Sequence, residues 1–200
     1  SEQRAVQLLA LTQVAGTITS SLQTTDLINS LLDQVKNILP YDTGTLWLRQ
    51  GDKLTVRAAR GFEDSDQRIG LSVAVADSLL LKEMVDTSQP LCVGDVREDP
   101  RFPSLIEHQY LSWLGVPLIS QGEVVGVIAL EKMEPDFYGS EHIGSAVTFA
   151  GQAAVGLVNA NLYEDSVRRA AELDERTQRL SLLNRLSAEL SGSLDVEYIV

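Results

Sequence analysis

The chain has 200 residues, 44% of them hydrophobic, and a formal net charge of −12, with 14 glycines and 6 prolines. This composition excludes collagen-like, low-complexity and wholly disordered chains, and it provides enough apolar material for a sizeable core. The acidic balance argues against nucleic acids and anionic membrane surfaces as partners, because both are bound through positive charge.

Cysteine usage and the N-terminal residues favour a cytoplasmic protein. The single cysteine, Cys92, can form neither an internal disulfide nor a multi-cysteine metal site, which is typical of a reducing compartment. The first residues lack the basic start and apolar core of a secretory signal. Residues 143–163 carry no charge and approach the length of a membrane span, but their alanines, glycines and polar side chains favour a buried helix.

The N-terminal quarter reads as helices followed by a hairpin. Apolar residues at helical spacing predict helices within residues 5–18 and 27–38, and Pro40 ends the second. The period then changes to that of strands, at 45–49 and 54–58, with a turn-rich connection of hairpin length between them.

The middle of the chain alternates short elements with one long polar segment. A third strand is expected at 71–74 and a helix at 77–87, which ends before Pro90 because the residue before proline is disfavoured in a helix. A short strand at 91–93 follows. Residues 94–110 are polar and show no sustained period, which is typical of a long connection that carries function.

The last third predicts a second hairpin and a long helix. Strands are expected at 113–120 and 123–131, joined at Gln121 and Gly122, and the apolar run of the second strand predicts that it is the most buried. From about residue 140 to 190 the sequence can form one long helix.

An internal similarity links the two ends of the chain. Residues 183–200 repeat the helix, serine-rich break and apolar pattern of residues 11–28. We therefore expect three regions: a full domain at 1–164, a helical linker at 165–191 and the truncated start of a second copy at 192–200. The mixed order of helices and strands predicts an α+β domain with a mostly antiparallel sheet.

The pattern resembles the GAF domain, a small-molecule sensor module of signalling proteins, over about residues 7–164. The first part of the resemblance is a Leu-Cys-Val-Gly-Asp-Val segment at 91–96, followed by Asp-Pro-Arg at 99–101. The second part is a pair of strands, Leu-Gly-Val-Pro-Leu at 114–118 and Gly-Val-Ile-Ala-Leu at 126–130. Phe137 and the helix at 149–163, which contains Gln-Ala-Ala and ends with Asn-Leu-Tyr, complete the resemblance. It implies a six-stranded antiparallel sheet of GAF/PAS-like type, with helices on both faces and long terminal helices. The implied ligand pocket lies on the face opposite the terminal helices, beneath residues 77–110.

Family subtypes differ at defined positions. The cysteine and histidine of phytochrome-like members correspond to Ile106 and Glu107, so covalent bilin attachment is not expected and any other cofactor is left open. Of the cyclic-nucleotide signature only Lys132 and Phe137 match, and Lys132 is expected to pair with Glu141 as a structural ion pair. Members that reduce methionine sulfoxide use more than one cysteine, whereas this chain has only Cys92, which is interpreted as a small buried hydrophobe.

Six residues are candidates for ligand binding, because a pocket needs an apolar lining with a few convergent polar groups. Trp47, Phe102, Tyr110 and Trp113 supply aromatic surface, with core packing as the alternative for each. Asp95 and Arg97 could orient a polar ligand, although Asp95 equally suits a turn that bonds its own backbone.

Catalytic and metal motifs are absent from the sequence. It contains no phosphate-binding glycine loop, no Gly-x-Ser-x-Gly elbow and no His-Glu-x-x-His pair. His108 is interpreted as a surface residue, with a ligand contact or axial haem ligation as alternatives. A triad of Asp95, His108 and Ser112 has nothing to fix its geometry. The chain is therefore not expected to be an enzyme or to hold a metal.

The helices suggest self-association. Ala146, Ala150 and Ala154 form a small-residue stripe that would let helices approach closely, and the leucines from Leu180 to Leu190 suit a parallel helical pair. We expect a homodimer through the terminal helices. The alternative is that this leucine face belongs to the truncated second domain.

These observations favour a non-enzymatic sensory or regulatory domain of a larger signalling protein. It would bind an unidentified small molecule, relay a signal through dimeric helices, or do both. The alternative is a structural dimerisation spacer that binds no ligand.

Overall fold

A computed structural model describes residues 24–102 and 110–194, with side chains up to residue 184. The chain divides into two compact units, Gln23–Ala160 and Ser1–Leu22 together with Asn161–Val200. The first unit holds the sheet and the helices that cover it. Of the second, residues 161–194 are described and are helical.

Six strands form one antiparallel sheet in the order β3-β2-β1-β6-β5-β4. Their bounds are β1 Thr43–Gln50, β2 Lys53–Arg60, β3 Ser72–Ala74, β4 Leu91–Val93, β5 Ser112–Ser120 and β6 Glu123–Lys132. β6 lies in the middle of the sheet and is buried on both faces, as its apolar run predicted. The six strands expected from the sequence are all confirmed, with ends shifted by at most two residues.

Tight turns close the two hairpins. Gln121 and Gly122, between β5 and β6, have φ of 53° and 83°. Positive φ at both central residues defines the turn whose twist matches that of the flanking strands, and glycine adopts it without steric cost. The sequence therefore fixes this connection at the two residues where it was expected.

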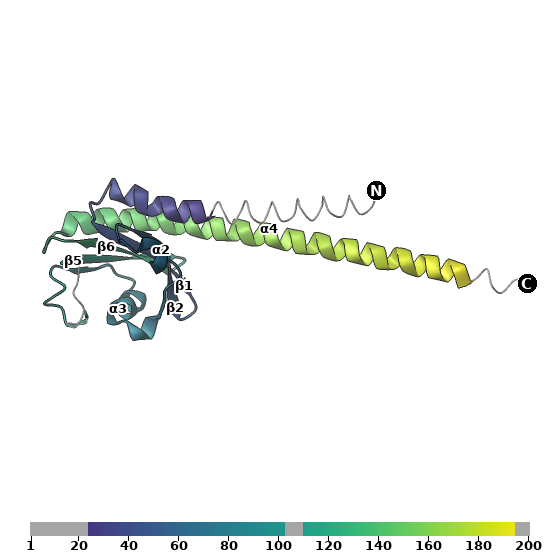
Figure 1. Ribbon diagram of the computed structural model, residues 1–200, viewed down its shortest axis with the longest axis horizontal. Helices are drawn as coiled ribbons and strands as arrows, with labels where there is room; N and C mark the ends of the chain where they lie inside the picture. Colours follow the sequence, from purple (N-terminus) through teal and green to yellow (C-terminus); the bar gives the residue numbers. More distant parts are fainter. Residues whose placement is uncertain (1–23, 103–109, 195–200) are drawn as a thin grey trace, which may run out of the picture. The chain divides into compact units, whose positions relative to one another are not determined.

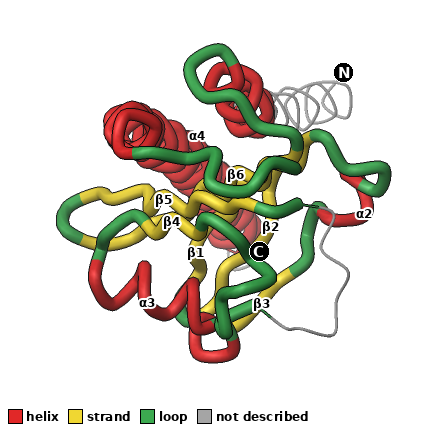
Figure 2. Tube along the Cα trace, turned by 90° about the vertical axis from the view of Figure 1, so that its left-hand side faces the viewer, coloured by secondary structure: helices red, strands yellow, loops and turns green. Residues whose placement is uncertain are grey.

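Helices cover both faces of the sheet. Residues 24–36 and the first part of α4 (Ser140–Leu194) lie on one face, and α3 (Leu79–Thr87) lies on the other (Figures 1 and 2). Two short elements lead into α3, namely the helix α2 at Ser65–Arg68 and the 3-10 turn η1 at Val75–Asp77. The expected helix at 27–38 is confirmed near its predicted position. The expected helix at 5–18 lies outside the described residues.

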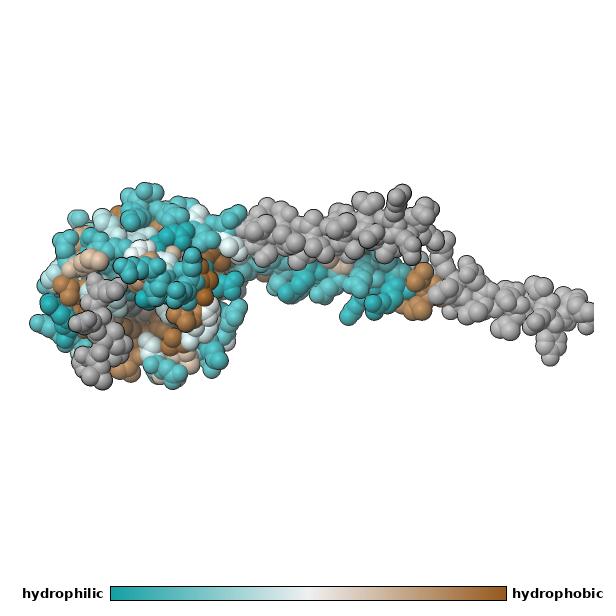
Figure 3. Space-filling view, in the orientation of Figure 1, coloured by the Kyte–Doolittle hydropathy of each residue, from teal (hydrophilic) through white to brown (hydrophobic). Residues whose placement is uncertain are grey.

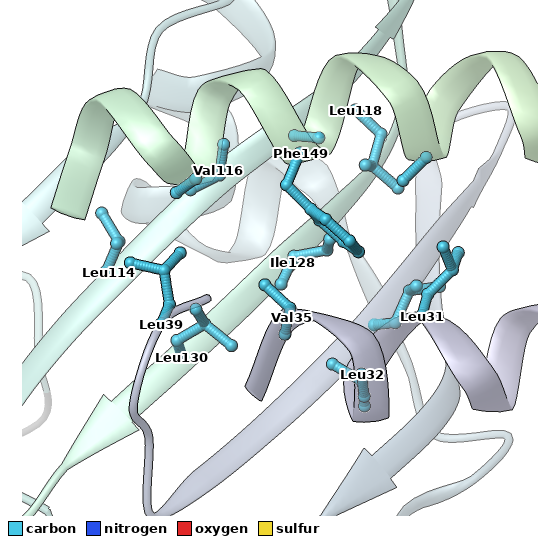
Figure 4. Packing of buried hydrophobic residues seen from close by; sticks show 14 of the residues in the cluster. Leu31, Leu32, Val35, Leu39, Leu114, Val116, Leu118, Ile128, Leu130 and Phe149 are labelled. Carbon is cyan, nitrogen blue, oxygen red and sulfur yellow. The ribbon is translucent and has the colours of Figure 1, made fainter. Parts of the chain in front are cut away.

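The larger core fills the layer between the sheet and the two long helices (Figure 4). Leu32 and Val35, from residues 24–36, belong to one cluster with Leu118 of β5 and Ile128 of β6, and the Phe149 ring of α4 lies among these side chains. Each fully buried aliphatic side chain of this kind stabilises the fold by about 1.5–3 kcal/mol relative to exposure.

The alanine stripe of α4 belongs to this core. Ala146, Ala150 and Ala154 are 3%, 1% and 0% exposed and pack in the same cluster as Leu157. Their small side chains let α4 approach its own sheet closely. The stripe is therefore not available for contact between subunits, and the expectation that it forms a dimer face is wrong.

α4 continues through the Ser191 to Ser193 segment to Leu194, so the helix break expected there is not present within the described residues. In the second unit, Leu173, Leu180 and Leu183 are each more than half exposed. Figure 3 shows hydrophobic atoms at the end of the described part of this helix. By length and composition α4 could cross a membrane, but core helices pass the same test, and part of this one is buried against its own sheet.

Candidate functional site

Aromatic side chains gather on the sheet face that α3 covers. We name this layer the α3-side cluster; its buried members are Leu54, Leu80, Leu81, Met84, Val93, Val96, Phe102, Trp113, Val124, Val127 and Ala129. Trp47 and Tyr110 pack against it from partly exposed positions. The ring centroid of Phe102 lies 5.9 Å from that of Trp113 and 6.4 Å from that of Tyr110, both edge to face.

Four of the six candidate residues thus share one face of the sheet. Trp47 comes from β1, Trp113 from β5, Phe102 from the middle of the long connection between β4 and β5, and Tyr110 from its end. The geometry is compatible with a ligand surface and with core packing, the two interpretations that the sequence left open.

A glycine fixes how Trp113 lies. Trp113 and Gly115 are two residues apart on β5 and so face the same side of the sheet. A Cβ at Gly115 would come within 2.2 Å of the Trp113 indole and 2.8 Å of the Met84 sulfur. Gly115 therefore provides the space in which the indole packs between the strand and α3.

The connection after β4 is held by two turns of the same kind. In each, an aspartate accepts a hydrogen bond from the backbone N–H of an arginine two residues later and pairs with its guanidinium: Asp95 with Arg97, and Asp99 with Arg101. Arg101 also donates to Glu83 of α3 at 2.7 Å. This second turn ties the connection to α3 and directly precedes Phe102, whose ring lies in the α3-side cluster.

The polar candidates Asp95 and Arg97 lie in the first of these turns. Their side chains bind each other, and the Arg97 hydrogen bonds lower the pKa of Asp95 to about 2. The Arg97 side chain is exposed. This geometry gives the pair a role in shaping the turn; a ligand contact by either residue stays a prediction.

Sequence reasoning missed the most unusual polar group of this face, Glu131. It lies on β6 in phase with Val127 and Ala129 of the α3-side cluster and is only 7% exposed. On the neighbouring strands it is paired with Thr43 and with Trp113. The Thr43 hydroxyl donates a hydrogen bond to its Oε2.

Burial raises the pKa of Glu131 to about 7, against an ordinary value of 4.5. The Thr43 hydrogen bond and the more distant Arg68 lower it only in part. A signal was available in the sequence, because an acidic residue that continues the core-facing alternation of a central strand is rare unless it is paired or functional.

Tyr110 and Arg68 lie near Glu131. Burial raises the pKa of Tyr110, and the negative charge of Glu131 raises it further. The Arg68 guanidinium donates to Asp64 at 2.7 Å and lies 4.0 Å from the centre of the Phe62 ring. Its charge is thus already balanced on α2 by Asp64.

Lys132 has a structural role different from the one expected. Its Nζ lies 2.9 Å from Asp42 and 3.8 Å from Glu134, and 5.0 Å from the centre of the Phe137 ring. The expected pair with Glu141 is not formed. Lys132 is the last residue of β6 and pairs with Asp42, the residue directly before β1. The Lys132–Asp42 ion pair therefore joins the ends of the two central strands, β6 and β1.

The remaining candidates carry little chemistry. The half-buried Cys92 thiol donates to the Tyr138 carbonyl oxygen at 3.3 Å, and burial raises its pKa, which suits a structural thiol. Ser112 is fully buried, and its hydroxyl has no hydrogen-bond partner among the described residues. Ile106, Glu107 and His108 lie outside them. Within residues 24–102 and 110–194, no group of three or more His, Cys, Asp or Glu is arranged to hold a metal ion.

Comparison with solved structures shows a shared fold. The chain is similar to the GAF domain of a phosphoenolpyruvate-protein phosphotransferase from Coxiella burnetii, with a TM-score of 0.62 and 19% identity over 77% of this chain and 97% of that one. It is also similar to the GAF domain of a two-component sensor histidine kinase from Bacillus halodurans, with a TM-score of 0.57 and 20% identity over 69% and 95% of the chains.

A third neighbour is an enzyme. The free methionine-R-sulfoxide reductase from Neisseria meningitidis, solved with its substrate, has a TM-score of 0.58 and 15% identity over 70% of this chain and 82% of that one. No curated protein matches the chain. The family model of the GAF domain matches residues 21–158. With that match and the six-stranded fold, the chain belongs to the GAF domain family.

Proposed function

We propose that this GAF domain is a non-enzymatic regulatory module of a signalling protein, and that it binds a small molecule at the α3-side cluster. The observation that carries the proposal is the gathering of Trp47, Phe102, Tyr110 and Trp113 in one cluster on a sheet face, with the buried Glu131 carboxylate next to Trp113. Apolar and aromatic surface with a few convergent polar groups is the chemistry of small-molecule sites.

The absence of enzymatic activity is proposed from the cysteine count. Reduction of methionine sulfoxide oxidises cysteine, and regeneration through a disulfide needs a second thiol. This sequence has one cysteine, Cys92, whose thiol is half-buried and has a raised pKa, so it is a weak nucleophile. The lone cysteine is also the basis for proposing a cytoplasmic location.

Ligand binding is tested by thermal unfolding of the protein with a panel of small metabolites. A ligand at one hundred times its Kd stabilises the native state by about 2.7 kcal/mol, a readily measured shift. We expect Trp113→Ala to abolish the shift. The matched control is Tyr163→Ala, which removes an aromatic side chain that is 59% exposed on α4, and it should respond as the parent does.

The alternative, a spacer that binds no ligand, is favoured by a different observation. Trp113, Phe102 and Met84 are 6%, 9% and 0% exposed, so the α3-side cluster already fills itself. A spacer would show no ligand-linked shift in the parent or in any variant, and it would still self-associate.

We also propose a homodimer formed through α4. Residues 143–163 carry no charge, yet Val147, Val155 and Leu162 are between 45% and 62% exposed. Gly151 adds open space on the same helix. An uncharged, exposed helical surface suits a contact with a second copy.

The dimer is tested by light scattering of the eluting protein. Val155→Glu should shift the mass from dimer to monomer, whereas Ser145→Glu, an exposed position on the same helix, should leave the dimer intact. A parent that elutes as a monomer would contradict the dimer. Because α4 continues as one helix to Leu194, a shift at the sheet would be passed along it.

A further inference from the structure

Within residues 24–102 and 110–184, the Glu131 carboxylate has no cationic partner of its own. Among the described residues, its only side-chain hydrogen bond comes from the neutral hydroxyl of Thr43, and no lysine, arginine or histidine lies within 4.0 Å. A carboxylate that is 7% exposed and supported by one neutral donor destabilises the fold whenever it is ionised. The described part of the site therefore carries one negative charge that no neighbouring positive charge balances.

The basic residues on the bordering segments do not balance this charge. Arg68 pairs with Asp64, Arg97 pairs with Asp95, and Arg101 pairs with Asp99 and Glu83. The same pairing argues against an anionic ligand, because each of these three guanidinium groups already has an acidic partner. With a net charge of −12, the protein as a whole also attracts cations.

Aromatic rings lie beside the carboxylate. Trp113 of β5 is the direct cross-strand neighbour of Glu131, and the Phe102 ring lies against the indole. Tyr110 is close enough for the charge of Glu131 to act on its phenol. A carboxylate next to aromatic faces is the combination that binds organic ammonium ions, through charge neutralisation and attraction of the cation to the rings.

We infer that the ligand of the α3-side cluster is a small organic ammonium ion, whose charge is neutralised by Glu131 and whose carbon groups contact Trp113. This inference rests on the proposed function and names its ligand class. Among the described residues, the titratable and charged groups that interact electrostatically with the carboxylate are Tyr110 on the connection, Arg68 on α2 and Tyr138. At pH 8 the carboxylate is largely ionised and the site is ready for a cation.

The test uses choline and phenethylammonium as probes, each beside a neutral compound of the same shape and an anionic one. For choline these are dimethylbutanol and dimethylbutyrate. The chain has two tryptophans, Trp47 and Trp113, and both belong to or pack against the α3-side cluster, so intrinsic fluorescence at pH 8 reports on this face directly. The variants are Glu131→Gln and, as matched control, Glu123→Gln, which removes an exposed carboxylate at the other end of β6.

We expect at least one ammonium probe to bind the parent and the Glu123→Gln protein about tenfold or more tightly than its neutral analogue, and Glu131→Gln to lose that preference. Equal binding of cation and neutral analogue, or unchanged cation binding by Glu131→Gln, would overturn the inference. If the neutral or anionic analogue binds the parent at least as tightly as the ammonium probe, and Glu131→Gln binds the ammonium probe as the parent does, the binding site stands and the cation does not. If no probe of any charge binds, the inference is contradicted, and the thermal unfolding panel of small metabolites decides separately whether the proposed site stands.

Discussion

Replacing Glu131 by glutamine should stabilise the protein in a pH-dependent way. The carboxylate is buried beside Thr43, and its pKa is raised from 4.5 to about 7 mainly because burial disfavours the charge. Glutamine has nearly the same shape, keeps the hydrogen bond with Thr43 and carries no charge. The variant therefore removes the cost of the buried charge and little else.

The sign and size follow from proton linkage. Between pH 4.5 and 7 the folded protein retains a proton that the unfolded chain loses, so the free energy of unfolding of the parent falls as the pH rises. A shift of this size corresponds to roughly 3 kcal/mol in total. Between pH 5.5 and 8, the free energy of unfolding of Glu131→Gln should rise relative to that of the parent by about 2 kcal/mol.

The assay is urea unfolding followed by tryptophan fluorescence at several pH values from 5.5 to 8. Glu123→Gln serves as the control, and its difference from the parent should stay within about 0.5 kcal/mol at every pH, as for most surface substitutions. Parallel stability curves for the parent and Glu131→Gln would refute the reasoning, because they would show that the Glu131 carboxylate is not desolvated in the folded protein.

Three further predictions test how the site is held. Gly115→Ala should destabilise the protein by about 1–3 kcal/mol and change the tryptophan emission, since the new methyl group displaces the Trp113 indole; unchanged stability in urea would contradict this packing. Arg101→Ala should speed hydrogen exchange in residues 94–102 by releasing that segment from Glu83, with no more than about 1 kcal/mol lost in global stability; unchanged exchange would show that the pair does not hold the connection. Iodoacetamide should alkylate Cys92 slowly at pH 8 until urea is added, because burial raises the thiol pKa; rapid labelling of the native protein would refute the structural role.

The sheet could be predicted because its signals are local. The alternation of Leu54 and Val56, the turn at Gln121 and Gly122, and the apolar run before Glu131 each identify a strand or its end without tertiary information. The family resemblance then implied the antiparallel, six-stranded arrangement with helices on both faces that the structure shows. The short helix α2 was missed, because its four residues, Ser65 to Arg68, are all polar and carry no apolar helical period.

The site was predictable in its apolar part alone. Aromatic residues near the long connection could be named from composition, whereas the pairing of Lys132 depends on which strand lies beside β6 and could not be read from spacing. The partner of each face of α4 could not be predicted either, since small residues such as Ala150 suit contact with a sheet or with another helix equally well. Glu131 was overlooked because its chemistry arises from burial, which only the assembled sheet creates.

The most direct test of ligand binding is native mass spectrometry of the gently purified protein beside its denatured mass. We predict a native mass that exceeds the 21.8 kDa chain, or a multiple of it, by one small molecule per chain. The excess should vanish on denaturation and be absent from Trp113→Ala. A native mass equal to the bare chain or its multiple, in a protein whose fluorescence no small molecule changes, would contradict the account and favour the spacer.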